Sequence, residues 1–211
     1  MQLFSVRSLT VALMLCASFG IETAQAAEED GATRGPGSDM VSALRATSPN
    51  ASLADHAKVI DRLVGDWEVA YTDFKKDGTT LHRTGRLLFG WVADGRVMQD
   101  LWIVDPWGSH RDREVYTDLF YFEPKSATWR VASVDPYEAS VATFTGGVVG
   151  DDRISIESHD LVADETRRWS FNDIGPDSLV FRDEASTDGG KTWRLVAEYH
   201  MKRRNPVAGT H

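Results

Sequence analysis

Apolar residues and other residues alternate with a period of two along most of this chain. The first such run is LVGDWEVAY at 63–71, where Trp67, Val69 and Tyr71 share one face, as in a strand that is buried on one side. Similar runs follow, and short turns rich in Asp, Gly and Pro separate them. The further strands are expected at 81–92, 96–104, 114–122, 128–134, 140–146, 153–159, 166–172, 178–185 and 192–203.

The connections between these runs do not hold the crossover helix that parallel strands need. An antiparallel meander that closes on itself has no exposed edge. The sequence therefore predicts an all-β fold, a single antiparallel up-and-down lipocalin-like barrel of about ten strands, with the barrel domain at 53–205.

A short helix is expected before the first strand. Apolar residues recur at helical intervals from Leu53 to Val64, which predicts a helix of about three turns. Ser52 and Asp55 have the spacing of a capping box at its start, and Gly65 would end it.

The N-terminal segment 1–26 has the features of a signal peptide. Arg7 supplies a positive charge, 9–19 is an apolar stretch too short to span a bilayer, and Ala24 to Ala26 form a small-residue cleavage site. We therefore expect the mature chain to be periplasmic or secreted. Residues 27–52 are expected to form a flexible leader, because they are rich in Ala, Gly, Ser, Pro and acids, and 206–211 to form a tail.

Charge and cysteine content exclude several function classes. The net charge is −9, and the mature chain keeps it because Arg7 and Glu22 cancel. Binding to nucleic acid or to an anionic membrane surface needs clustered Lys and Arg, so neither partner is expected, and no membrane insertion is expected after cleavage. Cys16 is the only cysteine and lies in the cleaved segment, so the mature chain has no thiol chemistry.

Two motifs mark the ends of the predicted barrel: Gly65-Asp66-Trp67 opens the first strand, and the basic pair Arg203-Arg204 ends the last. This combination resembles the lipocalin and calycin superfamily. The segments LLFGWVADGRVMQDLWIV, FEPKSATWRV and STDGGKTW look like a bacterial family of uncharacterised lipocalin-like barrels, related in shape to the nitrobindins. The resemblance implies that Trp67 packs across the barrel floor under a basic residue, with Gly65, Trp67 and Arg203 as structural residues. It implies no particular activity.

Tryptophan is frequent on the predicted strands, and all seven tryptophans lie between Trp67 and Trp193. A barrel of about ten strands is too wide for its own side chains to fill. We therefore expect an aromatic-lined cavity that takes a small-molecule ligand. The aromatic candidates for its lining are Trp91, Trp102, Tyr116, Phe120, Trp129, Trp169, Phe181 and Tyr199.

Charged residues on these strands could give the cavity chemistry. The candidates are Asp100, Arg182 and Glu184, and a buried carboxylate would need a cationic partner such as Arg182. The alternative is that these charges lie on the outer face of ordinary alternating strands. The long loop 105–113 is a candidate lid at the barrel mouth.

Haem is an alternative ligand, because the nitrobindins carry it on a histidine close to the C-terminus and His200 lies in that region. The glycine-rich opening of those barrels is missing, however, and His200 shares a polar strand face. No other cofactor or metal is expected, since the remaining histidines lack the paired spacing of a metal site. Those within the predicted barrel domain are His56, His82, His110 and His159.

These observations favour an extracytoplasmic lipocalin-like protein that binds a small apolar or aromatic molecule in the barrel cavity. One alternative is an enzyme of the isomerase, hydratase or hydrolase type that uses an acid–base pair in that cavity. A second is a haem-binding barrel. A third is a structural or protein-binding barrel with a filled core.

The cleavage site can be tested on exported protein. Edman degradation is expected to begin at Ala27, because the small-residue site ends at Ala26. Ala26→Leu should block this cleavage, since the site accepts small side chains. Exported protein that begins at Met1 or Cys16 would contradict the expected processing.

Overall fold

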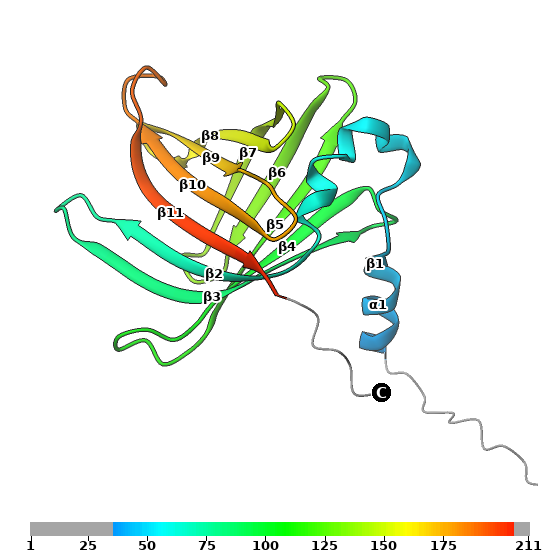
Figure 1. Cartoon of the computed structure of the whole chain (residues 1–211), viewed down its shortest axis with the longest axis horizontal. Coiled ribbons are helices and arrows are strands. Elements are labelled where there is room, and N and C mark those ends of the chain that lie inside the picture. The colour runs from blue at the N-terminus through cyan, green and yellow to red at the C-terminus, as the bar shows by residue number, and fades with distance from the viewer. Residues whose placement is uncertain (1–35, 205–211) are drawn as a thin grey trace, which may run out of the picture. The chain divides into compact units, whose positions relative to one another are not determined.

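The computed structural model describes residues 36–204, and a closed antiparallel β-barrel accounts for most of them (Figure 1). Each of the ten strands β2 to β11 pairs with its neighbours in sequence, and β11 also pairs with β2, which completes the circle. The predicted all-β up-and-down barrel is therefore confirmed. The strands are β2 (Gly65–Phe74), β3 (Thr80–Val92), β4 (Val97–Val104), β5 (Glu114–Glu123), β6 (Thr128–Asp135), β7 (Ser140–Val149), β8 (Arg153–Val162), β9 (Glu165–Asn172), β10 (Ser178–Ser186) and β11 (Arg194–Arg203).

Two short 3₁₀-helices, η1 (Ala51–Ala57) and η2 (Ile60–Leu63), stand where one helix was predicted. Ala54 has φ 46° and ψ −131°, which interrupts a regular helix. The cap is Asn50, whose side chain accepts the N–H of Ser52 at 3.1 Å. The predicted single helix with a Ser52 cap is therefore wrong.

The segment assigned to the leader contains α1 (Pro36–Leu44) and the two-residue β1 (Arg45–Ala46). β1 pairs antiparallel with the end of β3. The predicted signal peptide and the C-terminal tail lie outside the described residues. Within 36–204, no helix is long and apolar enough to cross a membrane.

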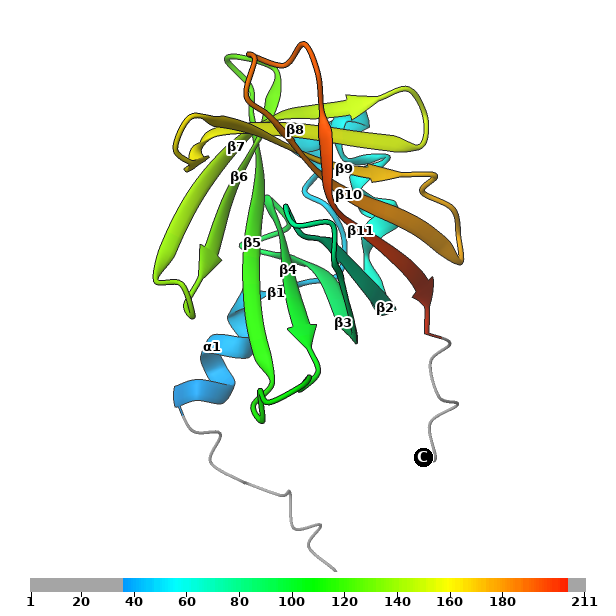
Figure 2. The same ribbon diagram turned by 90° about the vertical axis from the view of Figure 1, so that its left-hand side faces the viewer.

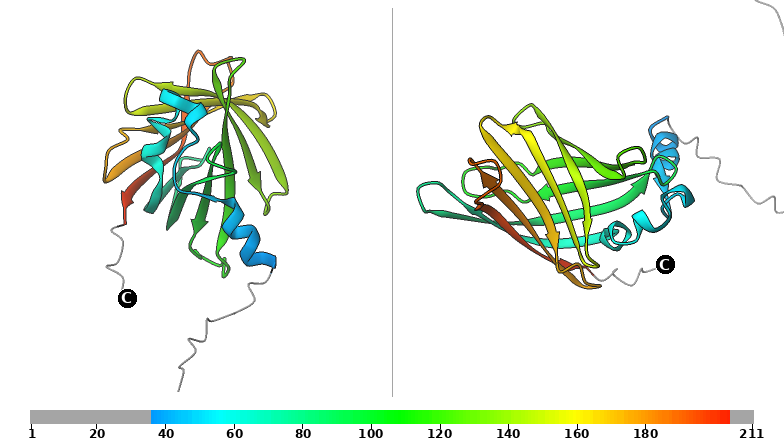
Figure 3. Two further views of the ribbon diagram at one scale, coloured as in Figure 1. Left: turned by 90° about the vertical axis from the view of Figure 1, so that its right-hand side faces the viewer. Right: turned by 90° about the horizontal axis from the view of Figure 1, so that it is seen from above.

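One end of the barrel is filled by a packed core. Phe89, Phe120 and Phe171 point inward from three strands, with ring centroids 5.8 to 6.4 Å apart. The two 3₁₀-helices add their buried apolar residues to this core. Figure 2 and Figure 3 show the strands curving around a common interior. The apolar residues from the helices are Leu53, Ala57, Ile60 and Leu63.

Arg203 at the end of β11 closes this end of the barrel. Its guanidinium carbon lies 4.0 Å from the centroid of the Trp67 indole, a cation–π contact. The indole N–H of Trp67 is donated to the carbonyl of Leu63 at 2.8 Å. The guanidinium also donates to three backbone carbonyls, those of Pro176 at 2.5 Å, Val64 at 2.7 Å and Arg62 at 2.9 Å.

Gly65 leaves the space that this guanidinium occupies. Its φ is +145°, which side-chain-bearing residues rarely adopt. A Cβ at this position would lie 2.2 Å from Nη1 of Arg203. The structure thus places Gly65, Trp67 and Arg203 in one contact at the floor, in the positions that the resemblance implied.

Loss of the floor tryptophan should strongly destabilise the fold. We expect Trp67→Ala to lower the free energy of unfolding by about 3–5 kcal/mol, because a fully buried ring is removed and the site collapses only partly. Urea unfolding followed by circular dichroism measures the change. Trp193→Ala is the matched control, since Trp193 is only half-buried and lies in the β10–β11 turn. Equal stability of Trp67→Ala and the parent protein would contradict the role of the floor.

Candidate functional site

The opposite end of the barrel holds a cavity of about 270 Å³. It lies where β2, β4, β6 and β10 end and where β3, β5, β7, β9 and β11 begin. Its aromatic lining consists of Tyr71, Trp102, Tyr116, Trp169, Phe181 and Tyr199. Its polar lining includes Arg83, Asp118, Ser133, Asp135 and Asp183.

The lining includes Trp102, Tyr116, Trp169, Phe181 and Tyr199 from the residues that the sequence predicts. The rings of Trp102 and Trp169 pack edge to face on Phe181, whose centroid lies 5.2 Å from that of Trp102 and 5.9 Å from that of Trp169. Tyr199 stacks on the same ring at 5.2 Å. These contacts hold the aromatic wall in a fixed arrangement.

Trp91, Phe120 and Trp129 point inward but belong to the packed end and do not line the cavity. The indole N–H of Trp91 is donated to Asp61 at 2.7 Å. Trp129 packs against Phe122 with 5.6 Å between centroids. The assignment of these three residues to the cavity is therefore wrong. Alternation predicts on which face of a strand a residue lies, but it does not predict how far along the barrel axis the residue lies.

Asp100 and Asp118 form a buried pair of carboxyl groups beneath the cavity. They lie directly opposite each other on β4 and β5, and they are 0% and 3% exposed. Both accept the indole N–H of Trp102, at 3.1 Å and 3.0 Å. Asp100 also accepts the backbone N–H of Asp118 at 2.8 Å. Asp118 lines the cavity, whereas Asp100 lies behind it.

Burial and mutual repulsion change the proton affinity of this pair. Burial, and then the charge of Asp118, raise the pKa of Asp100 well above its usual range. Burial also raises the pKa of Asp118, although hydrogen bonds from Ser133 and Trp102 oppose the effect. Two carboxyl groups placed in this way share one proton over a range of pH in which isolated groups would both ionise. No cationic side chain in 36–204 forms an ion pair with Asp100, so the arginine partner expected from the sequence is absent there.

A second polar group lies at the mouth of the cavity. Arg83 donates to Asp73 at 2.6 Å, and the hydroxyl of Tyr199 donates to the same carboxylate at 3.0 Å. Burial raises the pKa of Tyr199 well above its usual range, so it stays protonated and donates. The hydroxyl of Tyr71 is buried in this wall without a hydrogen-bond partner among the described residues.

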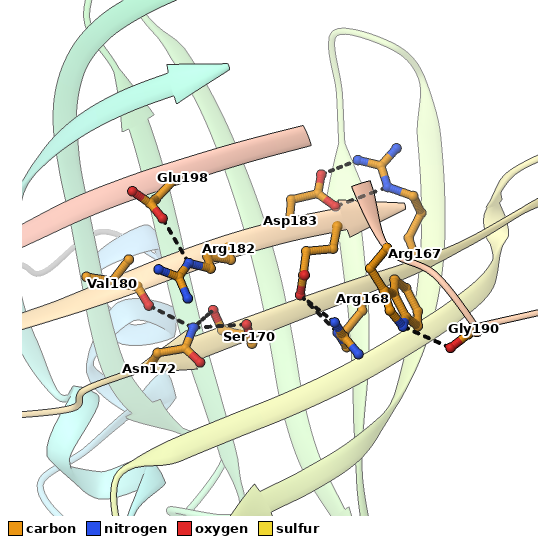
Figure 4. Close-up of polar contacts among 11 residues, drawn as sticks. Arg167, Arg168, Ser170, Asn172, Val180, Arg182, Asp183, Gly190 and Glu198 are labelled. Carbon is orange, nitrogen blue, oxygen red and sulfur yellow. Dashed lines mark hydrogen bonds and ion pairs between the residues drawn. The ribbon is translucent and has the colours of Figure 1, made fainter. Parts of the chain in front are cut away.

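Arg182 and Glu184, which were candidates for the cavity, do not line it, because of the alternation along β10. Phe181 and Asp183 line the cavity, so Arg182 and Glu184 lie on the outer face. There Arg182 pairs with Glu198 at 2.8 Å, and Glu184 pairs with Arg168 (Figure 4). Asp183 is the charged residue of β10 at the cavity, and it forms a two-pronged ion pair with Arg167 (Figure 4).

The loop 105–113 contacts the cavity through Arg83. The guanidinium carbon of Arg83 lies 4.8 Å from the ring centroid of Trp107. Trp107 stacks on His110 with 4.2 Å between centroids and 12° between planes. The loop therefore lies beside the mouth, as a lid would.

The residues do not fit a haem bound through His200. This side chain is 63% exposed, lies on the outer face of β11, and pairs with Glu198 at 3.0 Å. A ligand to an iron inside the barrel would have to point the other way. In the described part of the chain, no group of three His, Cys, Asp or Glu side chains is placed to hold a metal ion.

The sequence carried a signal for the cavity residues that were missed. Asp118 lies between Tyr116 and Phe120 at a spacing of two, so it shares their inward face. In the same way, Asp183 follows Phe181. The candidates had included Phe181 together with Arg182, and adjacent strand residues cannot share a face.

Replacing Asp118 should change how stability depends on pH. Because folding raises the pKa of Asp118, its contribution to stability falls as pH rises from about 4 through the raised pKa. Asn is neutral at every pH and keeps the oxygen that accepts from Trp102. We expect Asp118→Asn to be more stable than the parent at pH 7 by about 1–3 kcal/mol, with the gain vanishing towards pH 4.

Thermal unfolding across this pH range measures the difference. Glu68→Gln is the control, because Glu68 is 69% exposed on the outer face and should show no such trend. A parent protein that is more stable than Asp118→Asn at every pH would contradict the raised pKa.

No protein-family model and no curated protein matches this chain. Among solved structures, it is similar to the S-type phycobiliprotein lyase CPES from Guillardia theta, with 13% identity and a TM-score of 0.48 over 68% of this chain and 89% of that one. It is similar to Rv2717c from M. tuberculosis, with 11% identity and a TM-score of 0.49 over 72% of this chain and 99% of that one. A redesigned β-barrel is 12% identical, with a TM-score of 0.36 over 70% and 96% of the two chains.

Proposed function

We propose that this protein binds a small, largely aromatic or apolar molecule in the cavity at the open end of the barrel. The observation that supports this most directly is the contrast between the two ends. The end beneath the 3₁₀-helices is packed with apolar side chains and has a pocket beside η1, at His56, Phe122 and Trp129, whereas the other end leaves about 270 Å³ between aromatic rings. Rings held in this way stack on flat apolar ligands at little cost in side-chain entropy.

The volume limits the size of the ligand. Pockets for drug-sized molecules span about 300–1,000 Å³. The cavity here, at about 270 Å³, lies just below that range. The part of the ligand that lies inside this cavity is therefore about as large as one substituted ring.

The buried hydroxyl of Tyr71 supports a ligand with a polar atom. Tyr71 is 2% exposed, and its hydroxyl has no hydrogen-bond partner within 36–204. A buried polar group without a partner costs about 1–3 kcal/mol, and a ligand that meets it recovers this free energy. The Nε of Arg83, which also lines the cavity, is buried without a partner as well.

The site of action that we propose is the periplasm or the exterior of the cell. The support is the apolar stretch with a preceding arginine and a small-residue cleavage site at the N-terminus. The partner is the small molecule, and the acidic balance of the chain gives no basis for a nucleic-acid partner.

A second candidate function is proton transfer to a bound molecule. The observation that favours it is the Asp100–Asp118 pair, because a carboxyl group with a raised pKa at a cavity wall is suited to general-acid chemistry. Mass spectrometry of a bound compound after incubation in D₂O distinguishes the two functions. A binding protein returns the compound unchanged, whereas a proton-transfer enzyme adds deuterium at carbon, and Asp118→Asn should abolish that exchange.

Binding of one-ring compounds tests the proposed function. We expect 4-fluorophenol to bind the folded protein saturably, observed as broadening and shift of its ¹⁹F resonance. Trp102→Ala should weaken binding by about 1–2 kcal/mol, the scale of one aromatic contact with its burial. Trp193→Ala, in the turn outside the cavity, should leave the affinity unchanged. Absence of saturable binding to protein that is shown to be folded would overturn the proposal.

A further inference from the structure

The charges around the cavity are divided between two walls. The wall of β2, β3, β9, β10 and β11 contains both arginines, and each is already bound to a carboxylate of the same wall. Arg83 is held by Asp73 at 2.6 Å, and Arg167 by Asp183. Side-chain exposure in these two pairs is 12% to 14%, so the pairs are shielded from solvent. This wall is close to neutral.

The charged groups that the wall of β5 and β6 presents to the cavity are all carboxyl groups. Asp118 and Asp135 line the cavity, and no nitrogen of a Lys, Arg or His side chain in 36–204 lies within 4.0 Å of either carboxylate. Asp135 accepts the backbone N–H groups of Tyr137 and Glu138 through Oδ1, at 2.8 and 3.0 Å. Its other oxygen has no such partner. Glu114 adds a further carboxylate behind Tyr116, whose hydroxyl donates to it.

The pair of Asp118 and Asp100 retains negative charge in spite of its raised pKa. A shared proton neutralises one of the two carboxyl groups and leaves the other ionised. Two N–H groups, those of Trp102 and of the Asp118 backbone, stabilise this charge. Neither N–H brings a positive charge to the wall.

The remaining lining suits a positive group as well. Aromatic rings have a negative face, which attracts an ammonium group within about 6 Å. Trp102 and Tyr116 lie opposite each other on β4 and β5, on the same face as the carboxyl pair. The unpartnered oxygen of Tyr71 can accept a hydrogen bond from an N–H group. Rings, carboxylates and a free acceptor therefore meet in one cavity.

We propose that the ligand of this cavity is a small aromatic amine in its protonated form. Its ammonium group lies against the wall of β5 and β6, at Asp118 and Asp135, and its ring packs between Trp102, Phe181 and Tyr199. This inference rests on the proposed function and adds the charge of the ligand to it. A metal cation does not fit, because no three-ligand group exists in the described residues. An anion would meet two carboxylates, and the charge of each arginine is already balanced by a carboxylate of its own wall, although the Nε of Arg83 has no partner within 36–204.

Three compounds of similar size separate the effect of charge from that of shape. They are 2-phenylethylamine, which is cationic at pH 7, neutral 2-phenylethanol, and anionic 3-phenylpropionate. Isothermal titration of the mature protein should give an affinity for the amine about tenfold or more above that for the alcohol, the scale of a cation–π contact with an ion pair. The anion should bind more weakly than the alcohol.

Two isosteric variants locate the charge that selects the amine. Asp118→Asn and Asp135→Asn should each reduce the ratio of amine to alcohol affinity several-fold, while the affinity for the alcohol stays the same. Asn at 135 keeps the acceptor for the two turn amides, so this variant tests the wall even if Asp118→Asn fails to fold. The control is Glu68→Gln, which removes one acidic charge from the outer face and should leave the ratio unchanged.

The possible outcomes distinguish a failure of this inference from a failure of the proposed binding function. If the alcohol or the anion binds as tightly as the amine, or if both Asn variants keep the parental ratio, the inference is wrong and the binding function stands. If 4-fluorophenol binds and none of the three compounds does, the inference is also wrong. If neither 4-fluorophenol nor any of the three binds the folded protein, the proposed function fails with it.

Discussion

The pairing of β2 with β11 is the constraint on which the rest of this structure depends. All other pairs of barrel strands join neighbours in sequence, whereas this pair joins Trp67 to Arg203, at the two ends of the barrel sequence. Arg203 fixes the pair by binding the indole and three carbonyls at once. The closed circle sets the barrel radius, and the radius sets how much of the interior side chains can fill. In the closed barrel, side chains fill one end and leave a cavity at the other.

The interior divides along the barrel axis by the chemistry of its inward residues. At the floor, phenylalanine rings and the helix side chains pack together, and the indole N–H groups of Trp67 and Trp91 are donated to Leu63 and Asp61. At the mouth, ion pairs and carboxyl groups replace them, and each arginine there has its carboxylate. Asp118 and Asp135 are the exceptions, because the hydrogen bonds that they accept bring no positive charge. The open end is thus a polar, aromatic space supported by an apolar base.

The sequence reveals the barrel more readily than the site, for physical reasons. Strand alternation and short turns depend on nearest neighbours, so ten strands and the two faces of each strand can be predicted from the chain alone. The depth of a residue depends on the stagger between strands, which is why Trp91, Phe120 and Trp129 were assigned to the cavity but lie in the core. Arg182 and Glu184 could have been excluded, since Phe181 fixes the parity of β10. The kink at Ala54, which splits the predicted helix, has no signal in the pattern.

The topology also determines the order in which contacts can form. Every hairpin from β2–β3 to β10–β11 joins segments that are adjacent in the chain, so each can form as soon as its second strand exists. The β2–β11 seam differs from the hairpins because it joins the first barrel strand to the last, and it can form only when β11, from Arg194 to Arg203, is present. Until then the sheet has two free edges, one on β2 and one on the last strand that has formed, and other chains could join either edge. The same arginine that closes the floor therefore also ends the period in which the folding chain is open to self-association.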